Sequence, residues 1–338
     1  MAGGDLHPPR QYPRPRHIRR RVCLSIMIDP LYSKIESTPR PTLFAASGFV
    51  LLAAAGLWIS TLFELLLPEA SVAVVNALYY LPFMVLPVGL YMLRRPGMGA
   101  AMRLNALPLL PTLSVALLGA LSVYVASMLS AAWGAGLDAL GLRGLESVPV
   151  PQDQRQLLTS VVSLAAIPAI CEELLFRGFV LSAWESRGTR FAIGVTAALF
   201  ALLHSNLYGI PAYLLVGAVA GFLAFALDSL YAAMVYHTVY NTFCLVLPYL
   251  ASGQGDAPVT IDAAAIFSLA VQTVMIAAMM LMLMASLRLR ARREGIEPIP
   301  RIHRPLEERD RAMLLAAVLA MAASTLILLI LTTRGGAA

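Results

Sequence analysis

Nine mostly apolar stretches follow one another along this chain, separated by short polar or charged segments. About 20 apolar residues in an α-helix are enough to cross the hydrocarbon core of a bilayer, and a helix satisfies its own backbone hydrogen bonds there. The predicted spans are residues 42–67, 70–93, 107–135, 157–184, 190–208, 211–227, 229–251, 263–287 and 312–333. We therefore expect an all-α, polytopic helical membrane protein with about nine transmembrane helices.

Composition agrees with a membrane protein and excludes an ordinary soluble domain. The chain is 59% hydrophobic and only 13% charged, whereas about a quarter of the residues of a soluble domain are charged. Cysteine usage indicates no disulfide framework, because Cys23, Cys171 and Cys244 form no CxxC pair. Cys171 and Cys244 fall within apolar spans and are most simply packing residues.

The distribution of charge predicts which side of the membrane each loop faces. Of the 25 basic residues 24 are arginine, and most of them fall in the N-terminal tail, in residues 94–106 and in residues 288–311. Because basic residues collect in cytoplasmic loops, we expect a multi-pass protein of the cell (inner) membrane with a cytoplasmic N-terminus. The same rule accounts for the net charge of +6 without a nucleic-acid partner. The preference for arginine over lysine suggests a GC-rich bacterial genome.

Four regions are expected along the chain. Residues 1–40 resemble a basic, disordered cytoplasmic tail that is rich in proline and arginine. Residues 41–150 hold the N-terminal transmembrane helices, and residues 253–338 hold the C-terminal ones with a basic cytoplasmic loop. Residues 151–252 contain most of the polar side chains that lie within spans, so we expect a four-helix catalytic core there.

Three charged residues interrupt the fourth predicted span, in the motif "PAICEELLFRGFV" at residues 168–180. An ionisable side chain within a bilayer costs a few kcal/mol and usually serves a function. Glu173 and Arg177 are four residues apart, so they lie on one helix face and can form an ion pair that supports the structure. Glu172 is rotated by about 100° from Glu173 and is expected to point into a cavity. The alternative is that all three form one inert network.

Two further spans place polar side chains at a similar depth. His204 lies in "LFALLHSN", and His237 and Asn241 lie four apart in "AAMVYHTVYN". Counted at 1.5 Å per residue, Glu172 and His204 lie roughly 20 Å from the cytoplasmic side, and His237 and Asn241 roughly 12 and 18 Å. A lone histidine on an apolar helix is usually a packing residue, but here three helices bring a carboxylate, two imidazoles and an amide to one layer.

This set of side chains is suited to hydrolysis of an amide bond. Glu172 could accept a proton from water with the help of His204, while His237 and Asn241 could stabilise an oxyanion. The sequence has no GxSxG or HExxH motif, which argues against a serine hydrolase and the common zinc proteases. Two alternatives stay open: Glu172, His204 and His237 could bind a divalent metal such as zinc, and buried Glu and His also occur in proton-coupled transporters.

Three motifs resemble those of the CPBP family of intramembrane proteases, the CAAX prenyl endopeptidase type II and bacteriocin-processing (Abi) group. They are Glu172-Glu173-xxx-Arg177, Phe200-xxx-His204 and His237-xxx-Asn241, and the resemblance covers roughly residues 155–250. It implies a hydrolase that cleaves a membrane-embedded or lipidated substrate near its C-terminus.

By this resemblance, Glu172 activates water with His204, His237 and Asn241 form the oxyanion site, and Glu173 and Arg177 are structural. Members of the family have been described both as metalloproteases and as glutamate-type proteases, so the resemblance implies either no cofactor or a divalent metal. It names neither the substrate nor the oligomeric state. The alternative function is a non-catalytic membrane binding protein or bacteriocin-immunity protein of the same fold.

Overall fold

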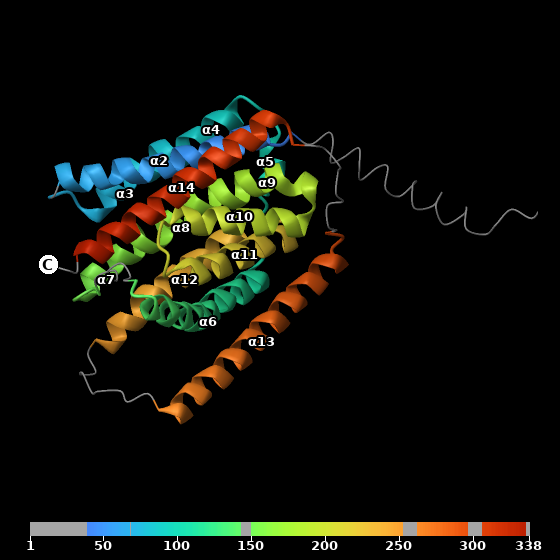
Figure 1. Ribbon diagram of the computed structural model, residues 1–338. Helices are drawn as coiled ribbons and strands as arrows, with labels where there is room; N and C mark the ends of the chain where they lie inside the picture. The colour runs from blue at the N-terminus through green and yellow to red at the C-terminus, as the bar shows by residue number, and fades with distance from the viewer. Residues whose placement is uncertain (1–38, 68, 143–149, 253–261, 297–305, 336–338) are drawn as a thin grey trace, which may run out of the picture. The chain divides into compact units, whose positions relative to one another are not determined.

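The computed structural model describes residues 39–67, 69–142, 150–252, 262–296 and 306–335. These residues form helices joined by short turns, and no β-strand occurs among them (Figure 1). The predicted all-helical membrane fold is thereby confirmed. Nearly all of the predicted tail at residues 1–40 lies outside the described residues, as does Cys23.

The helical elements follow the predicted spans closely. They are α2 (Leu43–Leu66), α3 (Val72–Tyr80), η1 (Leu81–Val85), α4 (Leu86–Leu93), α5 (Met98–Ala101), α6 (Leu109–Ala139), α7 (Gln154–Ser160), η2 (Val161–Ala166), α8 (Ile167–Glu173), η3 (Leu174–Val180), α9 (Leu181–Trp184), η4 (Glu185–Arg187), α10 (Thr189–Leu203), α11 (Ile210–Ala226), α12 (Leu230–Ala251), α13 (Ala263–Arg293) and α14 (Glu308–Gly335). The elements η1, η2 and η3 are π-helical, and η4 is a 3₁₀ turn.

Seven helical segments of the described chain are long and apolar enough to cross a membrane. The other two predicted spans are shorter: α10 has 15 residues and α11 has 17. At 1.5 Å per residue they are about 22 and 26 Å long, against about 30 Å for the hydrocarbon core of a bilayer. In the described chain, seven of the nine predicted spans are thus long enough for a full crossing, and the predicted total of nine is not confirmed.

The long span Gln154–Arg187 changes from α- to π-helical register twice. The N–H of Ile167 donates to the carbonyl of Val162, five residues back, and the N–H of Leu181 donates to that of Phe176. A π-turn holds one residue more than an α-turn, so it changes the direction of the side chains on either side of it. Glu172 lies on α8, between these two π-helical elements.

Small residues let the core helices approach one another closely. A Cβ atom added at Gly217 of α11 would lie 2.9 Å from Cα of Ala197 on α10, and one at Gly119 of α6 would lie 2.7 Å from the carbonyl oxygen of Tyr236 on α12. Both distances are shorter than a normal carbon contact. At these two positions, glycine is therefore required by the packing of neighbouring helices.

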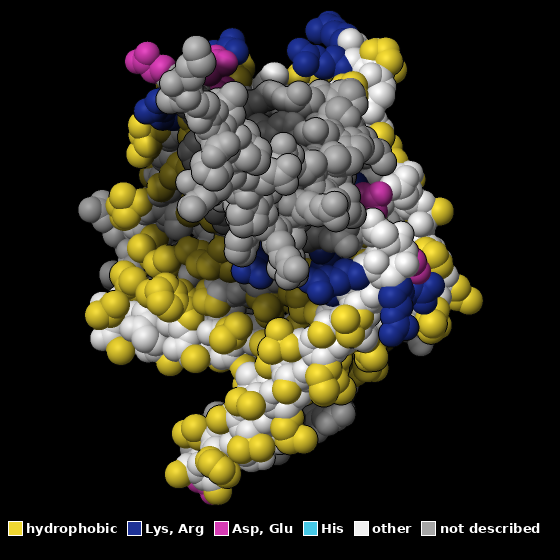
Figure 2. Space-filling model, turned by 90° about the vertical axis from the view of Figure 1, so that its right-hand side faces the viewer, with side chains coloured by type: hydrophobic (Ala, Val, Ile, Leu, Met, Phe, Trp, Pro, Cys, Tyr) yellow, Lys and Arg dark blue, Asp and Glu magenta, His cyan; other side chains and the backbone are white. Residues whose placement is uncertain are grey.

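Arginine side chains gather at one end of the helices (Figure 2). Glu185, which is buried, forms ion pairs there with Arg103 and with Arg40, whose Nη1 lies 2.6 Å from Glu185 Oε2. These pairs join the start of α2, the α5–α6 connection and η4. They hold the ends of these spans together at a distance from the polar residues of the core.

Candidate active site

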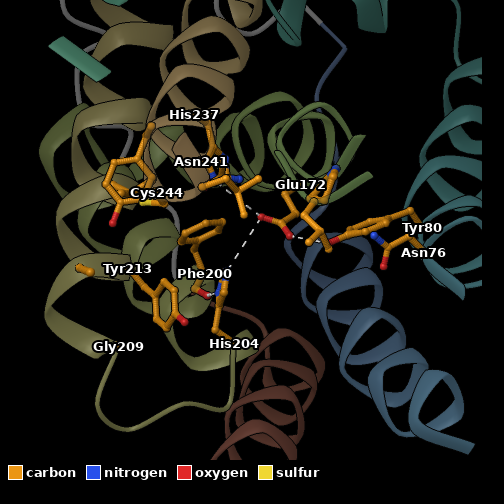
Figure 3. A pocket seen from close by; sticks show the side chains of 16 residues that line it. Asn76, Tyr80, Glu172, Phe200, His204, Gly209, Tyr213, His237, Asn241 and Cys244 are labelled. Atoms are coloured by element: carbon orange, nitrogen blue, oxygen red, sulfur yellow. Dashed lines mark hydrogen bonds and ion pairs between the residues drawn. The ribbon is translucent and has the colours of Figure 1, made fainter. Parts of the chain in front are cut away.

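A cavity of about 460 Å³ lies within the helices and collects the polar side chains of the spans (Figure 3). Its wall includes all four residues that the sequence predicted as catalytic: Glu172 on α8, His204 at the end of α10, and His237 and Asn241 on α12. Helices far apart in the sequence thus bring a carboxylate, two imidazoles and an amide to one space.

Glu172 lies between the two histidines. Its Oε2 atom is 4.0 Å from Nε2 of His204 and 3.9 Å from Nε2 of His237. Its other oxygen, Oε1, accepts a hydrogen bond of 2.8 Å from the hydroxyl of Tyr80. One carboxylate oxygen is therefore occupied by a protein donor, while the other faces the two imidazoles.

Each imidazole is oriented by a hydrogen bond at Nδ1. In His204 this atom lies 2.8 Å from the carbonyl oxygen of Phe200, and in His237 it lies 2.9 Å from Oε1 of Glu173. Because a carbonyl or carboxylate oxygen accepts, Nδ1 must carry the proton in both rings. In a neutral ring Nε2 is then an acceptor, so both histidines present lone pairs toward Glu172 Oε2.

Aromatic rings fix the two imidazoles further. Phe200 packs edge-on against both, with centroids 4.6 Å from His204 and 5.6 Å from His237. Tyr213 stacks on His204 at 4.0 Å with an interplanar angle of 22°. Such contacts restrict ring rotation, so the Nε2 atoms are held in place from several sides.

Glu173 lies next to Glu172 in the chain but has different surroundings. Both Glu173 and Arg177 are fully buried, and Arg177 Nη1 lies 2.8 Å from Glu173 Oε1. The guanidinium also lies over the ring of Phe200, 4.4 Å from its centroid. The structure thus contains the predicted ion pair. It adds one partner that the sequence did not indicate, because the same Oε1 holds His237.

The sequence did not reveal the part of the site that comes from α3. Asn76 and Tyr80 line the cavity, although they lie outside the predicted core at residues 151–252. Tyrosine is common in apolar helices and gave no signal. Asn76 gave a weak one, since it is the only amide side chain in the predicted span 70–93.

The side chains of the cavity are not drawn together into a three-ligand cluster. In the part of the chain that the structure describes, no three His, Cys, Asp or Glu side chains are placed to hold a metal ion. A divalent metal held by Glu172, His204 and His237 stays a prediction. The separations of 3.9 and 4.0 Å suit a water molecule, because hydrogen bonds of about 2.8 Å from one oxygen reach atoms roughly 4 to 5 Å apart.

One family model matches the segment that carries most of this site. Residues 154–243 match the family model of the Type II CAAX prenyl endopeptidase Rce1-like proteins. The matched segment runs from α7 into α12 and contains all four candidate catalytic residues, which confirms the resemblance of this segment to the CPBP family. No curated protein and no solved structure matches the chain.

Proposed function

We propose that this protein is an intramembrane endopeptidase. It would hydrolyse a peptide bond near the C-terminus of a membrane-associated or lipidated protein, within the bilayer. The observation that carries the proposal is the position of Glu172 Oε2 opposite two histidine Nε2 atoms in a cavity between apolar helices. The match of this segment to a family of prenyl endopeptidases supports the same reaction class.

In the proposed reaction, Glu172 and His204 hold one water molecule. Glu172 Oε2 takes a proton from the water while the water oxygen forms a bond to the carbonyl carbon of the substrate. The π electrons of the carbonyl group move to the carbonyl oxygen, which becomes the oxyanion. The C–N bond then breaks, and the protonated Glu172 returns its proton to the leaving nitrogen. The products are a carboxylic acid and an amine, and the carboxylate of Glu172 is restored.

His237 and Asn241 would stabilise the oxyanion of the intermediate. Asn241 can donate through its amide, whereas His237 can donate from Nε2 only when the ring carries a second proton, because Nδ1 already donates to Glu173. The carboxylate of Glu173 fixes the orientation of this ring by accepting from Nδ1. In this proposal Glu173 acts on the reaction through His237, besides pairing with Arg177.

The protein would act as a multi-pass protein of the cell (inner) membrane, with its N-terminus in the cytoplasm. Arginine-rich connections at one end of the helices support this orientation by the positive-inside rule (Figure 2). Its substrate would be a membrane-embedded peptide or protein that reaches the cavity from the bilayer.

The test compares protein C-termini in cells that produce the wild-type protein or Glu172→Gln at equal levels. A small set of membrane proteins or peptides should be cleaved only in cells with the wild-type protein. Identical C-termini in both, with both proteins present and folded, would contradict the proposal and favour non-catalytic binding.

A further inference from the structure

We infer that Tyr80 is a positioning residue for Glu172, so that α3 completes a site whose other parts lie within residues 154–243. This inference rests on the proposed function. Tyr80 would hold Oε1 of the carboxylate and thereby direct Oε2 toward the water between the two histidines.

The first support is the contact itself. The hydroxyl of Tyr80 donates to Glu172 Oε1 at 2.8 Å, and Tyr80 and Glu172 are only 8% and 7% exposed (Figure 3). A carboxylate with two equivalent oxygens can rotate about its terminal bond, since this torsion is broad. A donor on one oxygen removes that freedom and leaves the other oxygen as the proton acceptor.

The second support is the way in which α3 is attached to the helix that carries Glu172. Asn76 Nδ2 donates to the carbonyl oxygen of Ser163 at 2.5 Å. In an α-helix that carbonyl would accept from Ile167, but in η2 the N–H of Ile167 donates to Val162 instead. The next residue, Pro168, has no N–H to offer. Asn76 therefore satisfies a carbonyl that the π-turn releases.

Asn76 and Tyr80 are four residues apart, so both lie on one face of α3. Asn76 fixes the position of that face against η2, and Tyr80 reaches Glu172 about one turn further along. Two polar contacts on one face of α3 thus fix the position of the Glu172 carboxylate along α3 and the direction in which it points. A proline and a π-turn, which usually disturb a helix, here create the acceptor that fixes α3.

The test uses Tyr80→Phe, which removes one hydroxyl and preserves the ring. The matched control is Tyr79→Phe, because Tyr79 is also buried but donates to the carbonyl of Ala53, at 3.3 Å, rather than to Glu172. The probe is a synthetic peptide that spans a cleavage position found by the comparison of cellular C-termini, assayed with purified full-length protein in proteoliposomes.

Tyr80→Phe should lower kcat by about 10- to 100-fold, since small misplacement of a reacting group costs about this much, while KM stays unchanged. Tyr79→Phe should keep the kcat of the wild type. Asn76→Leu should lower both Tm and kcat, because the carbonyl of Ser163 loses its donor.

Equal kcat for Tyr80→Phe and the wild type, with Glu172→Gln inactive, would overturn the role of Tyr80 and leave the proposed function intact. Equal losses for the Tyr79 and Tyr80 variants would also overturn it, since the effect would then come from packing. An inactive wild-type protein would instead refute the proposed function, and with it this inference.

Discussion

Glu172 and Glu173 are neighbours in the chain, yet they lie in two different regions of the molecule. Glu172 borders a cavity of about 460 Å³ and has one oxygen directed at two imidazoles. Glu173 is sealed among helices and is held by the cation of Arg177 and by His237. We call the surroundings of Glu172 the open region and the surroundings of Glu173 the sealed region.

The comparison shows how one helix separates chemistry from support. Successive residues of a helix point about 100° apart, so adjacent carboxylates can face unrelated surroundings. His237 connects the two regions, because its Nδ1 contacts Glu173 and its Nε2 faces Glu172. Substitutions in the open region should change turnover, and substitutions in the sealed region should change stability first.

The largest effect is expected for Glu172→Gln, which keeps the shape of the side chain and removes the proton acceptor. Loss of a general base should lower kcat by about 10²- to 10⁴-fold, with Tm unchanged. Peptide hydrolysis in proteoliposomes and thermal unfolding in detergent measure the two quantities. Glu173→Gln is the paired control and should lower Tm; equal loss of Tm in both variants would remove the distinction between the regions.

Arg177→Ala should produce the next largest effect, now on stability. It leaves Glu173 as an unpaired charge in a fully buried place, and breaking a buried pair in this way costs about 3–5 kcal/mol. Reversible unfolding in mixed micelles measures the free energy. An unchanged free energy of unfolding would show that Glu173 is not held as a charge.

A smaller effect is expected at Gly217, which borders the sealed region. The Cβ of Gly217→Ala would lie 2.9 Å from Cα of Ala197 and 3.1 Å from Nη2 of Arg177, and overpacking of this kind costs about 1–3 kcal/mol. Gly194→Ala on α10 is the control, because a Cβ there meets nothing within 4 Å. Gly194→Ala should leave the free energy of unfolding equal or slightly higher. An equal loss of this free energy in both glycine variants would contradict the packing argument.

The smallest effect is expected for Arg290→Ala. Arg290 and Glu294 also form a pair four residues apart, at 2.9 Å, but their side chains are 40% and 51% exposed. Water screens such a pair, so its loss should change the free energy of unfolding by at most about 0.5 kcal/mol. The difference between the losses of unfolding free energy in Arg177→Ala and Arg290→Ala measures the effect of burial, because both pairs are four residues apart and 2.8 to 2.9 Å long.

Much of the fold could be predicted because apolar length and charge act locally. The predicted spans coincide with helical segments of the described chain to within several residues, and the spacing of Glu173 and Arg177 predicted their contact. The short lengths of α10 and α11 were harder to predict from the sequence. The turn that joins them contains Leu207 and Tyr208, so the apolar pattern ran past the end of α10 at Leu203.

The contacts that complete the site could not be predicted from local pattern. Tyr80 lies 92 residues from Glu172, and His237 lies 64 residues from Glu173. Such pairs depend on how the helices pack and on the π-turns that rotate one part of a span against another. Periodicity over a window of residues does not reveal a single added residue in a turn.

The two short helices of the core have a consequence for the lipid around them. Helices α10 and α11, about 22 and 26 Å long, are joined by a turn that contributes His204 and Gly209 to the cavity wall. A hydrophobic length below that of the bilayer is a mismatch, which lipids relieve by local thinning. Thinning would bring headgroups and water toward His204. If such thinning supplies the water of the proposed reaction, hydrolysis should be faster in proteoliposomes of shorter acyl chains.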